Sequence, residues 1–428
     1  MRSIVALGLA TCLLAAGCSG PGPHRPALPP PAPTVGATTT GPVLEVPQVM
    51  LVWTPGRLPP GFAARVGGLP GVRHAVPVVS GTVWLARSLD GDGHVVDRPP
   101  AGMAIPLDLA AAAPQALAPF LPPPDQGVVA GLERGAAILG ATSARLRRIG
   151  AGGTLEIDAP ARPGGRSGSG GAARQAVRIA GIVPDQDVGA HELLVSREQA
   201  AILGQTTDRY LLVQPAAGTP WQALAARIRA TLPPGVPVRI RGPGQATWLR
   251  QGDAVLPQVV EKALLGEFAA KPQPAPGGWI TIDPAWVNQH IVTAAVPILG
   301  RVTCNRAIIP QLRGALAEVV RRGLAQLVNP ADYAGCYAAR VIAGDPGPSL
   351  AHHAWGSAID LNATANPQGA PPHQDPRLVS VFERWGFTWG GRWLVPDAMH
   401  FELLRLQPSR PSRSAGDPIR AWSWELAA

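Results

Sequence analysis

The stretch HHAWGSAIDLN, residues 352–362, decides how the C-terminal part of this chain folds and which chemistry it can support. Asp360 lies seven positions after His353, and Gly356 stands between them. Small and apolar residues alternate after the glycine, which predicts a turn that leads into a strand. The histidine would precede that strand and the aspartate would lie on it, close enough to share one metal ion. The neighbouring His352 is an alternative ligand.

A third ligand is available forty residues later, in the segment PDAMHFEL (396–403). A catalytic zinc site takes three protein ligands and leaves a further position open, and His400 supplies the missing imidazole. Asp397 stands three residues before it. A carboxylate at that place can take the proton of an attacking water and later return it to a leaving amine. The segment therefore holds both a candidate ligand and a candidate general base.

Several ordered segments place these residues in a longer pattern, R…HxxGxAxD…DxxHFE. The segments are CNRAIIPQL (304–312), GCYAAR (335–340), HAWGSAIDLN (353–362), GFTWGGRW (386–393) and PDAMHFEL (396–403). This order resembles the VanY-like D-alanyl-D-alanine carboxypeptidases, which are zinc peptidases of the bacterial cell wall with a hedgehog/DD-peptidase fold. Phage L-alanyl-D-glutamate endopeptidases share the pattern. The resemblance covers about 120 residues, roughly from Pro284 to Leu404.

The resemblance implies a role for each matching residue. It makes His353, Asp360 and His400 the ligands of Zn²⁺, and it makes Asp397 the catalytic acid and base. Arg340, in GCYAAR, matches an arginine that stabilises the oxyanion and positions the substrate, which a fixed guanidinium can do.

Other positions of the pattern carry less certain roles or depart from it. Ala351 stands where the family usually has a serine that helps to hold the terminal residue of the substrate, so the substrate detail and the activity are open at this point. Two residues could orient ligands from outside the metal site, namely Asn362 and Glu402. Three tryptophans could line a substrate groove or pack in the core, namely Trp355, Trp389 and Trp393.

The N-terminus predicts export. Residues 1–18 combine one positive charge, a short apolar run and the ending LLAAGC, which resembles a bacterial lipoprotein signal peptide with Cys18 as the lipidated residue. An ordinary signal peptide is the alternative. Residues 19–47 are rich in Pro, Gly and Thr and predict an extended tether. Cys304 and Cys336 then remain as an even pair in an exported protein, which favours a disulfide over two buried thiols.

Residues 48–270 predict an α/β accessory domain, because strand-like and helix-like segments alternate along them. The segments GAGGTLEI (150–157) and VRIAGIVPD (177–185) resemble the extracytoplasmic core domain of MacB-like permeases, which implies a binding or scaffolding module with a possible envelope protein partner. His191 and Glu192, in HELLV, lack the second histidine of a zinc helix and are interpreted as exposed polar residues of a strand.

The sequence thus predicts an α+β protein of two globular domains. KPQPAPGG (271–278) is the expected linker, and 279–428 is the expected zinc peptidase domain with a small antiparallel sheet and helices. Within it, the apolar spacing of IIPQLRGALAEVVRRGLAQLV predicts a helix with Pro310 in its first turn.

The composition bounds the partners. The net charge is +9, but basic residues form no long run and no stripe with aromatic residues, so we expect no nucleic-acid partner. We expect a lipid-anchored protein at the outer face of the cytoplasmic membrane or the cell wall, a zinc carboxypeptidase acting on peptidoglycan stem peptides. The alternatives are an L-alanyl-D-glutamate endopeptidase and a non-catalytic, zinc-containing wall-binding lipoprotein.

Overall fold

The computed structural model describes residues 48–160, 173–245, 248–272 and 274–407. The predicted signal peptide with Cys18 and the predicted tether lie outside these residues. Among the described residues, no helix is both long and apolar enough to cross a membrane. The described chain is mixed α+β, as the sequence predicts, and it contains a small antiparallel sheet near the C-terminal end.

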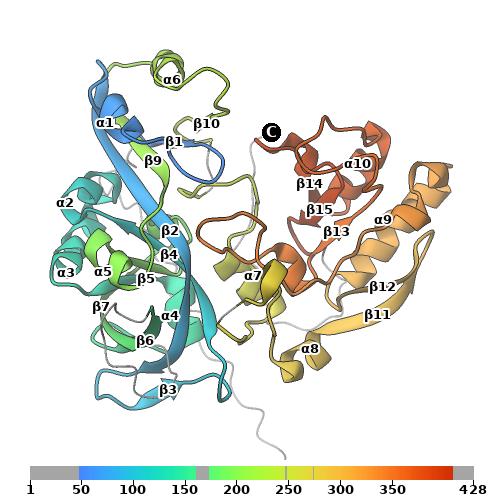
Figure 1. Ribbon diagram of the computed structural model, residues 1–428, viewed down its shortest axis with the longest axis horizontal. Coiled ribbons are helices and arrows are strands. Elements are labelled where there is room, and N and C mark those ends of the chain that lie inside the picture. The colour runs from blue at the N-terminus through green and yellow to red at the C-terminus, as the bar shows by residue number, and fades with distance from the viewer. Residues whose placement is uncertain (1–47, 161–172, 246–247, 273, 408–428) are drawn as a thin grey trace, which may run out of the picture. The chain divides into compact units, whose positions relative to one another are not determined.

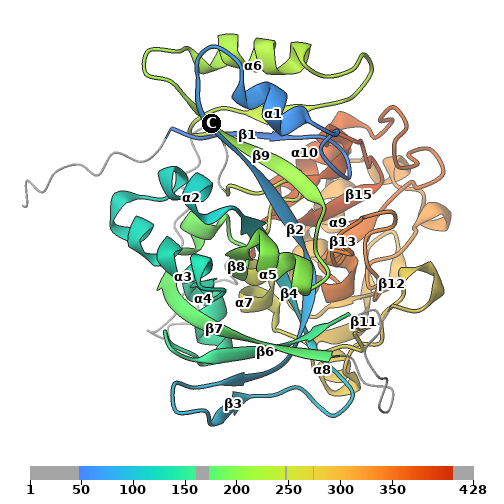
Figure 2. The ribbon, with the colours of Figure 1, turned by 60° about the vertical axis from the view of Figure 1, so that its left-hand side comes forward.

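Ten described strands form one sheet, and six of them close into a ring (Figures 1 and 2). The strands are β1 (Met50–Trp53), β2 (Val72–Leu89), β3 (Val95–Asp97), β4 (Ile105–Ala112), β5 (Ala137–Gly140), β6 (Thr154–Ala159), β7 (Ala173–Val183), β8 (Leu193–Ser196), β9 (Asp208–Pro215) and β10 (Arg239–Arg241). The order β2-β4-β8-β5-β7-β6 returns to β2, because β2 also pairs with β6. The long strand β2 therefore belongs both to this barrel and to the extension β9-β1-β10.

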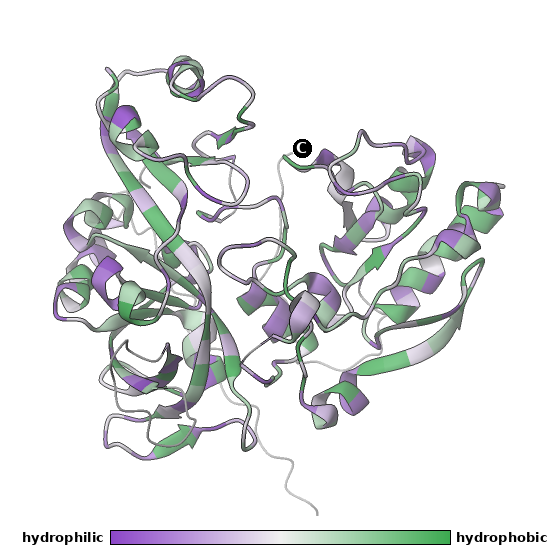
Figure 3. Cartoon of the chain, in the orientation of Figure 1, coloured by the Kyte–Doolittle hydropathy of each residue, from purple (hydrophilic) through white to green (hydrophobic). Residues whose placement is uncertain are grey.

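The barrel interior follows from the two-residue period of its strands. Alternate residues of β4 point inward, and the same period recurs on β6 and β8. The inward residues of these strands are Ile105, Leu107, Leu109, Ala111, Leu155, Ile157, Leu193 and Val195. Figure 3 shows hydrophobic stretches along β2 with more polar residues between them. The sequence predicted strand-like and helix-like segments in this region, but not the closure between β2 and β6.

The pairing differs from the α/β arrangement that the sequence suggested. Only β4–β8 and β5–β7 are parallel, and the other pairs of the sheet are antiparallel. The helices of this region are α1 (Phe62–Gly67), α2 (Pro114–Leu117), α3 (Val129–Glu133), α4 (Ala141–Arg147), α5 (Arg197–Ile202) and α6 (Trp221–Ala230). Most of them are one or two turns long, shorter than the helices that usually connect parallel strands.

The interpretation of His191 and Glu192 as exposed strand residues is wrong, because both side chains are fully buried. His191 Nδ1 lies 3.0 Å from Asp108 Oδ1, and its Nε2 lies 3.1 Å from the hydroxyl of Tyr210. Glu192 accepts a hydrogen bond from Lys262 at 2.8 Å. The partners that permit this burial are distant in sequence, so the local pattern gave no sign of them.

The C-terminal part contains a hairpin and a three-stranded sheet with helices beside them. Its elements are α7 (Gln258–Leu265), α8 (Pro284–His290), β11 (Ile291–Val296), β12 (Gly300–Asn305), α9 (Ile309–Arg321), β13 (Ala358–Asp360), α10 (Pro376–Arg384), β14 (Phe387–Trp389) and β15 (His400–Leu403). The sheet order is β13-β15-β14, all antiparallel. The predicted helix is confirmed over Ile309–Arg321 as α9, with Pro310 at its start and Leu312, Leu316 and Val319 buried, whereas residues 322–328 of the predicted segment lie beyond it.

One apolar cluster joins these elements. It includes residues of α7 as well as residues of α9, α10 and the three-stranded sheet. The predicted disulfide is confirmed between Cys304, at the end of β12, and Cys336. The domain boundary at 271–278 stays a prediction.

Candidate metal centre

Three candidate ligands come from a short turn and two paired strands. His353 belongs to a 3₁₀ turn, His352–Trp355, and Asp360 ends β13. His400 begins β15, directly opposite Asp360 in the antiparallel pair, so the two side chains leave the same face of the sheet. Gly356 ends the turn with φ +65°, and a Cβ there would lie 2.6 Å from the backbone nitrogen of Asn305. Only glycine fits this link between turn and strand.

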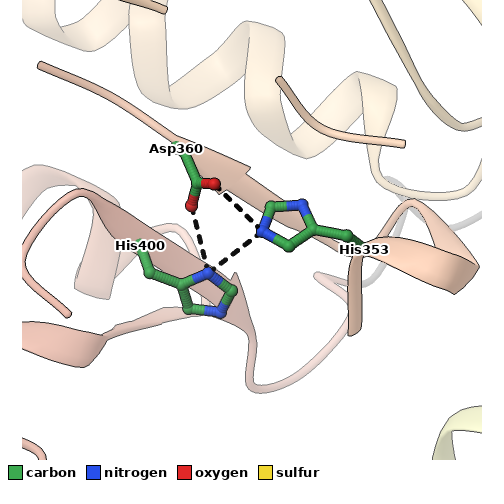
Figure 4. A group of neighbouring side chains, drawn as sticks. All are labelled: His353, Asp360 and His400. Atoms are coloured by element: carbon green, nitrogen blue, oxygen red, sulfur yellow. Dashed lines mark hydrogen bonds and ion pairs between the residues drawn. The ribbon is translucent and has the colours of Figure 1, made fainter. Parts of the chain in front are cut away.

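The three side chains point toward one another (Figure 4). His353 Nε2 lies 3.2 Å from Asp360 Oδ2 and 3.2 Å from His400 Nδ1. His400 Nδ1 lies 3.1 Å from Asp360 Oδ1. One atom from each residue lies within 4.8 Å of the others, and all three residues are largely buried. Two imidazoles and one carboxylate form a donor set that suits a divalent cation such as zinc.

The outer nitrogen of each imidazole is also engaged, as expected for a metal ligand. His353 Nδ1 lies 2.7 Å from the carbonyl oxygen of Cys336, which the disulfide fixes to β12. His400 Nε2 lies 3.2 Å from Glu402 Oε2. Each ring therefore turns its other nitrogen toward the shared point between the three residues. The arrangement fits a bound cation.

The electrostatics also favour a positive charge at this point. Burial alone would raise the pKa of Asp360, but the hydrogen bonds from His353 and His400 lower it well below its usual range. Burial would lower the pKa of His400, but Asp360 and Glu402 raise it to about 10. The cluster thus stabilises a cation in the form of a proton, and a metal ion can replace that proton.

Asp397 lies within electrostatic reach of the cluster and of Arg340. Burial raises the pKa of Asp397, the positive charges of His400, His353 and Arg340 oppose that rise, and the negative charge of Asp360 adds to it. The Oδ1 atom of Asp397 is buried and has no hydrogen-bond partner among the described residues. A free, buried carboxylate oxygen beside a candidate metal site is available to accept a proton.

Residues 345–403 match the family model described as D-alanyl-D-alanine carboxypeptidase. The match includes all three candidate ligands and Asp397. It begins at residue 345, so it does not include Arg340. No curated protein matches the sequence. The family match and the clustered side chains therefore involve the same segment of the chain.

Two solved structures are similar to part of this chain. The periplasmic region of MacB from Actinobacillus actinomycetemcomitans is 10% identical over 45% of this chain and 88% of its own, with a TM-score of 0.30. The extracellular domain of the noncanonic ABC-type transporter YknZ from Gram-positive bacteria is 12% identical over 45% of this chain and 99% of its own, with a TM-score of 0.26.

The tryptophans proposed for a groove have different surroundings. Trp355 is buried and packs against Phe268, so it offers no surface to a substrate. Trp389 donates from Nε1 to the carbonyl oxygen of Ala398 at 2.8 Å and remains partly exposed. The Trp393 ring lies 5.1 Å from the His400 ring, beside the cluster. Trp393 is therefore the one of the three that adjoins the candidate ligands.

Asn362 does not contact the candidate ligands through its side chain. Its Nδ2 donates to Leu327 O and Gln374 Oε1, and its Oδ1 accepts from the Asn329 backbone. It therefore stabilises the loop after β13, with a left-handed φ of 53° that asparagine tolerates better than most residues. Its expected role in orienting ligands is not supported.

Two further residues near the site were not found from the sequence. Trp279 pairs with Arg340 in an isolated antiparallel bridge, so the two side chains leave the same face, and Trp279 is 53% exposed. Glu261, from α7, contacts His352 and Ser357 and lies close to Glu402. Both residues precede the matched segment, and neither belongs to a motif that could have identified it.

Proposed function

We propose that this protein is a zinc-dependent peptidase of the D-alanyl-D-alanine carboxypeptidase type that hydrolyses peptidoglycan stem peptides. The observation that carries the proposal is the cluster of His353, Asp360 and His400, with the unpartnered carboxylate of Asp397 beside it, inside the matched segment 345–403. The three clustered residues would hold the ion, which supplies polarisation of the scissile carbonyl and a lower pKa for the attacking water.

The protein's own groups would perform the proton transfers. Asp397 Oδ1 accepts a proton from the attacking water and passes it to the nitrogen of the departing amine. Because burial raises the pKa of Asp397, this carboxylate is a better base than an exposed aspartate. Arg340 would hold the carbonyl oxygen as it becomes negative, and its fixed charge favours that state over the neutral one.

The same proposal extends to the fold and the compartment. We assign residues 279–428 to a hedgehog/DD-peptidase-like domain and residues 48–270 to an accessory domain. We also propose export with a lipid on Cys18, and the Cys304–Cys336 disulfide supports the export, because such bonds persist in oxidising compartments. The stem peptide carries carboxylates, which suits the net charge of +9.

The test uses purified full-length protein, its bound zinc determined by elemental analysis, and a pentapeptide stem that ends in D-Ala-D-Ala. We expect one zinc per chain and loss of one terminal alanine by mass. A chelator should abolish the cleavage and added Zn²⁺ should restore it. Cleavage after the first L-alanine would identify an endopeptidase instead. Bound zinc with no cleavage would indicate a wall-binding protein. That outcome is relevant because Ala351 stands where the family usually has a serine that helps to hold the substrate.

A further inference from the structure

Helix α7 carries two adjacent charged residues that are both buried. Glu261 and Lys262 are 0% and 1% exposed, although charged side chains are rarely buried without partners. Successive residues of an α-helix point about 100° apart, so the two side chains meet different neighbours. The helix precedes the matched segment, and Figure 3 colours part of it as hydrophilic. Each of the two charges therefore needs its own explanation.

Lys262 holds the helix against the barrel. Its Nζ lies 2.8 Å and 3.0 Å from the two carboxylate oxygens of Glu192, which immediately precedes β8. Gln258, one turn earlier, donates to Glu192 at 2.8 Å and to the carbonyl oxygen of Pro106 in β4 at 3.1 Å. Glu267 lies 3.0 Å from the same ammonium group. These bonds fix the position of α7 and with it the direction in which Glu261 points.

Glu261 points toward the outer side of the metal cluster. Its Oε1 accepts a hydrogen bond from Ser357 Oγ and lies 3.7 Å from His352 Nδ1. The same His352 nitrogen lies 3.1 Å from Glu402 Oε2, and that oxygen also lies 3.2 Å from His400 Nε2. Close polar approaches therefore run from α7 to a candidate ligand, and in the middle of them His352 Nδ1 lies near both carboxylates without a hydrogen bond to either.

The segment before α7 holds Glu402 from its other side. The backbone N–H of Val255 donates to Glu402 Oε1 at 2.9 Å. Both oxygens of the Glu402 carboxylate are thus engaged, one by Val255 and the other by His352 and His400. The orientation of Glu402, and through it that of the His400 ring, depends on residues 255–261, which no comparison assigns to the site.

Stability alone does not account for Glu261. A buried carboxylate loses its hydration, and an apolar side chain of similar size is often neutral or stabilising in its place. Burial raises the pKa of Glu261 to about 7, with His352 and Ser357 opposing the rise. Its Oε2 atom has no hydrogen-bond partner among the described residues. A side chain kept at this cost to the fold serves another purpose.

We propose that Glu261 is a positioning residue of the metal site, which confines His352 and thereby holds Glu402 in the orientation that His400 requires. The inference rests on the ligand set of the proposed function and not on peptide hydrolysis. Without Glu261, the His352 ring loses one of the two carboxylates beside its Nδ1 and is held by Glu402 alone, so Glu402 faces a less confined neighbour. Loss of such an outer contact typically weakens metal binding by about 10–100-fold.

The test measures the zinc dissociation constant of full-length protein by competition with a chelator. Glu261→Leu should weaken zinc binding by about tenfold, and Glu261→Gln, which keeps a hydrogen-bonding group, should restore most of that loss. The thermal midpoint of zinc-free Glu261→Leu should equal or exceed that of wild type, because the variant buries no carboxylate. The hydroxyl of Ser357 can still donate to the carbonyl oxygen of His352, so it is not left without an acceptor. With Co²⁺ in place of zinc, the visible absorption bands should shift in Glu261→Leu.

Glu318→Leu is the matched control. Glu318, on α9, accepts hydrogen bonds from Trp385 and Arg384, and it has no hydrogen bond or ion pair with a candidate ligand. Its replacement should leave the zinc dissociation constant and the Co²⁺ spectrum unchanged. If Glu261→Leu does not fold, Ser357→Ala replaces it, with an expected loss of at least about threefold in zinc affinity.

Unchanged zinc affinity in a folded Glu261→Leu or Ser357→Ala protein would overturn the inference. So would a loss of affinity that Glu318→Leu shares. Stem-peptide cleavage measured on the same samples separates the two proposals. Zinc binding that depends on Glu261, without cleavage of any stem peptide, would support this inference and overturn the proposed activity. Cleavage by wild type, with zinc affinity unaffected by the Glu261 variants, would do the reverse.

Discussion

Glu261→Gln should change how the stability of the zinc-free protein depends on pH. An unfolded glutamate titrates near 4.5, whereas burial raises the pKa of Glu261 in the folded protein to about 7. Below the lower value the carboxyl is protonated in both states. Between the two values the folded protein keeps a proton that the unfolded chain has lost, so the free energy of unfolding of wild type falls as the pH rises.

The size of the effect follows from the interval between the two pKa values. Each pKa unit corresponds to about 1.4 kcal/mol, so the folded protein carries a penalty of about 3 kcal/mol once the pH exceeds 7. A glutamine has no charge to bury and carries no such penalty. The variant should therefore be similar to wild type in stability at about pH 5, and more stable by up to about 3 kcal/mol at about pH 8.

Urea unfolding, followed by tryptophan fluorescence at both pH values with a chelator present, measures this difference. The chelator matters because a bound cation would lower the pKa of Glu261. Glu318→Gln provides a control of opposite sign, because its hydrogen bond from Trp385 lowers the pKa of Glu318, and the stability that this gives is present above the unfolded pKa. The reasoning would be refuted if Glu261→Gln changed the free energy of unfolding by the same amount at both pH values.

Three more predictions concern single side chains. Asp397→Asn should retain bound zinc by elemental analysis and lower the rate of stem-peptide cleavage by about 10²–10⁴-fold. Lys262→Met should lower the free energy of unfolding by about 3–5 kcal/mol in urea, because it leaves the buried Glu192 without its charged partner; an effect near zero would contradict the burial of that pair. Trp279→Ala should raise KM for the stem peptide by up to roughly tenfold with little change in kcat, since the exposed ring shares a face with Arg340.

The parts of the structure that the sequence predicted depend on short-range spacing. Apolar residues recur every three to four positions along α9, and this spacing predicts the helix because one of its faces packs in the core. The cluster of His353, Asp360 and His400 was predictable because Gly356 ends the turn and the residues after it enter one strand. The pairing of that strand with β15 then needs only one register to bring Asp360 opposite His400.

The parts that could not be predicted depend on contacts between distant segments. Strand-like segments were recognised along residues 48–270, but nothing local indicates that β2 pairs with β6 and closes the ring. The same holds for the buried polar residues His191 and Glu192, which look like solvated residues until Asp108 and Lys262 are placed beside them. The three proposed groove tryptophans also differ only in their tertiary surroundings.

Helix α7 combines a segment whose helical form is local in origin with side-chain contacts to distant segments near the candidate site. QVVEKALL has the composition of an ordinary amphipathic helix, in which an adjacent Glu and Lys would face water. In the structure the helix has no solvated face for them, and each finds partners more than sixty residues away, Glu261 at Ser357 and Lys262 at Glu192. Because both buried charges must be satisfied at once, the helix has little freedom to slide or rotate without leaving one of them unpaired. A disturbance at the barrel end of α7 should therefore reach Glu402 and the ligand behind it.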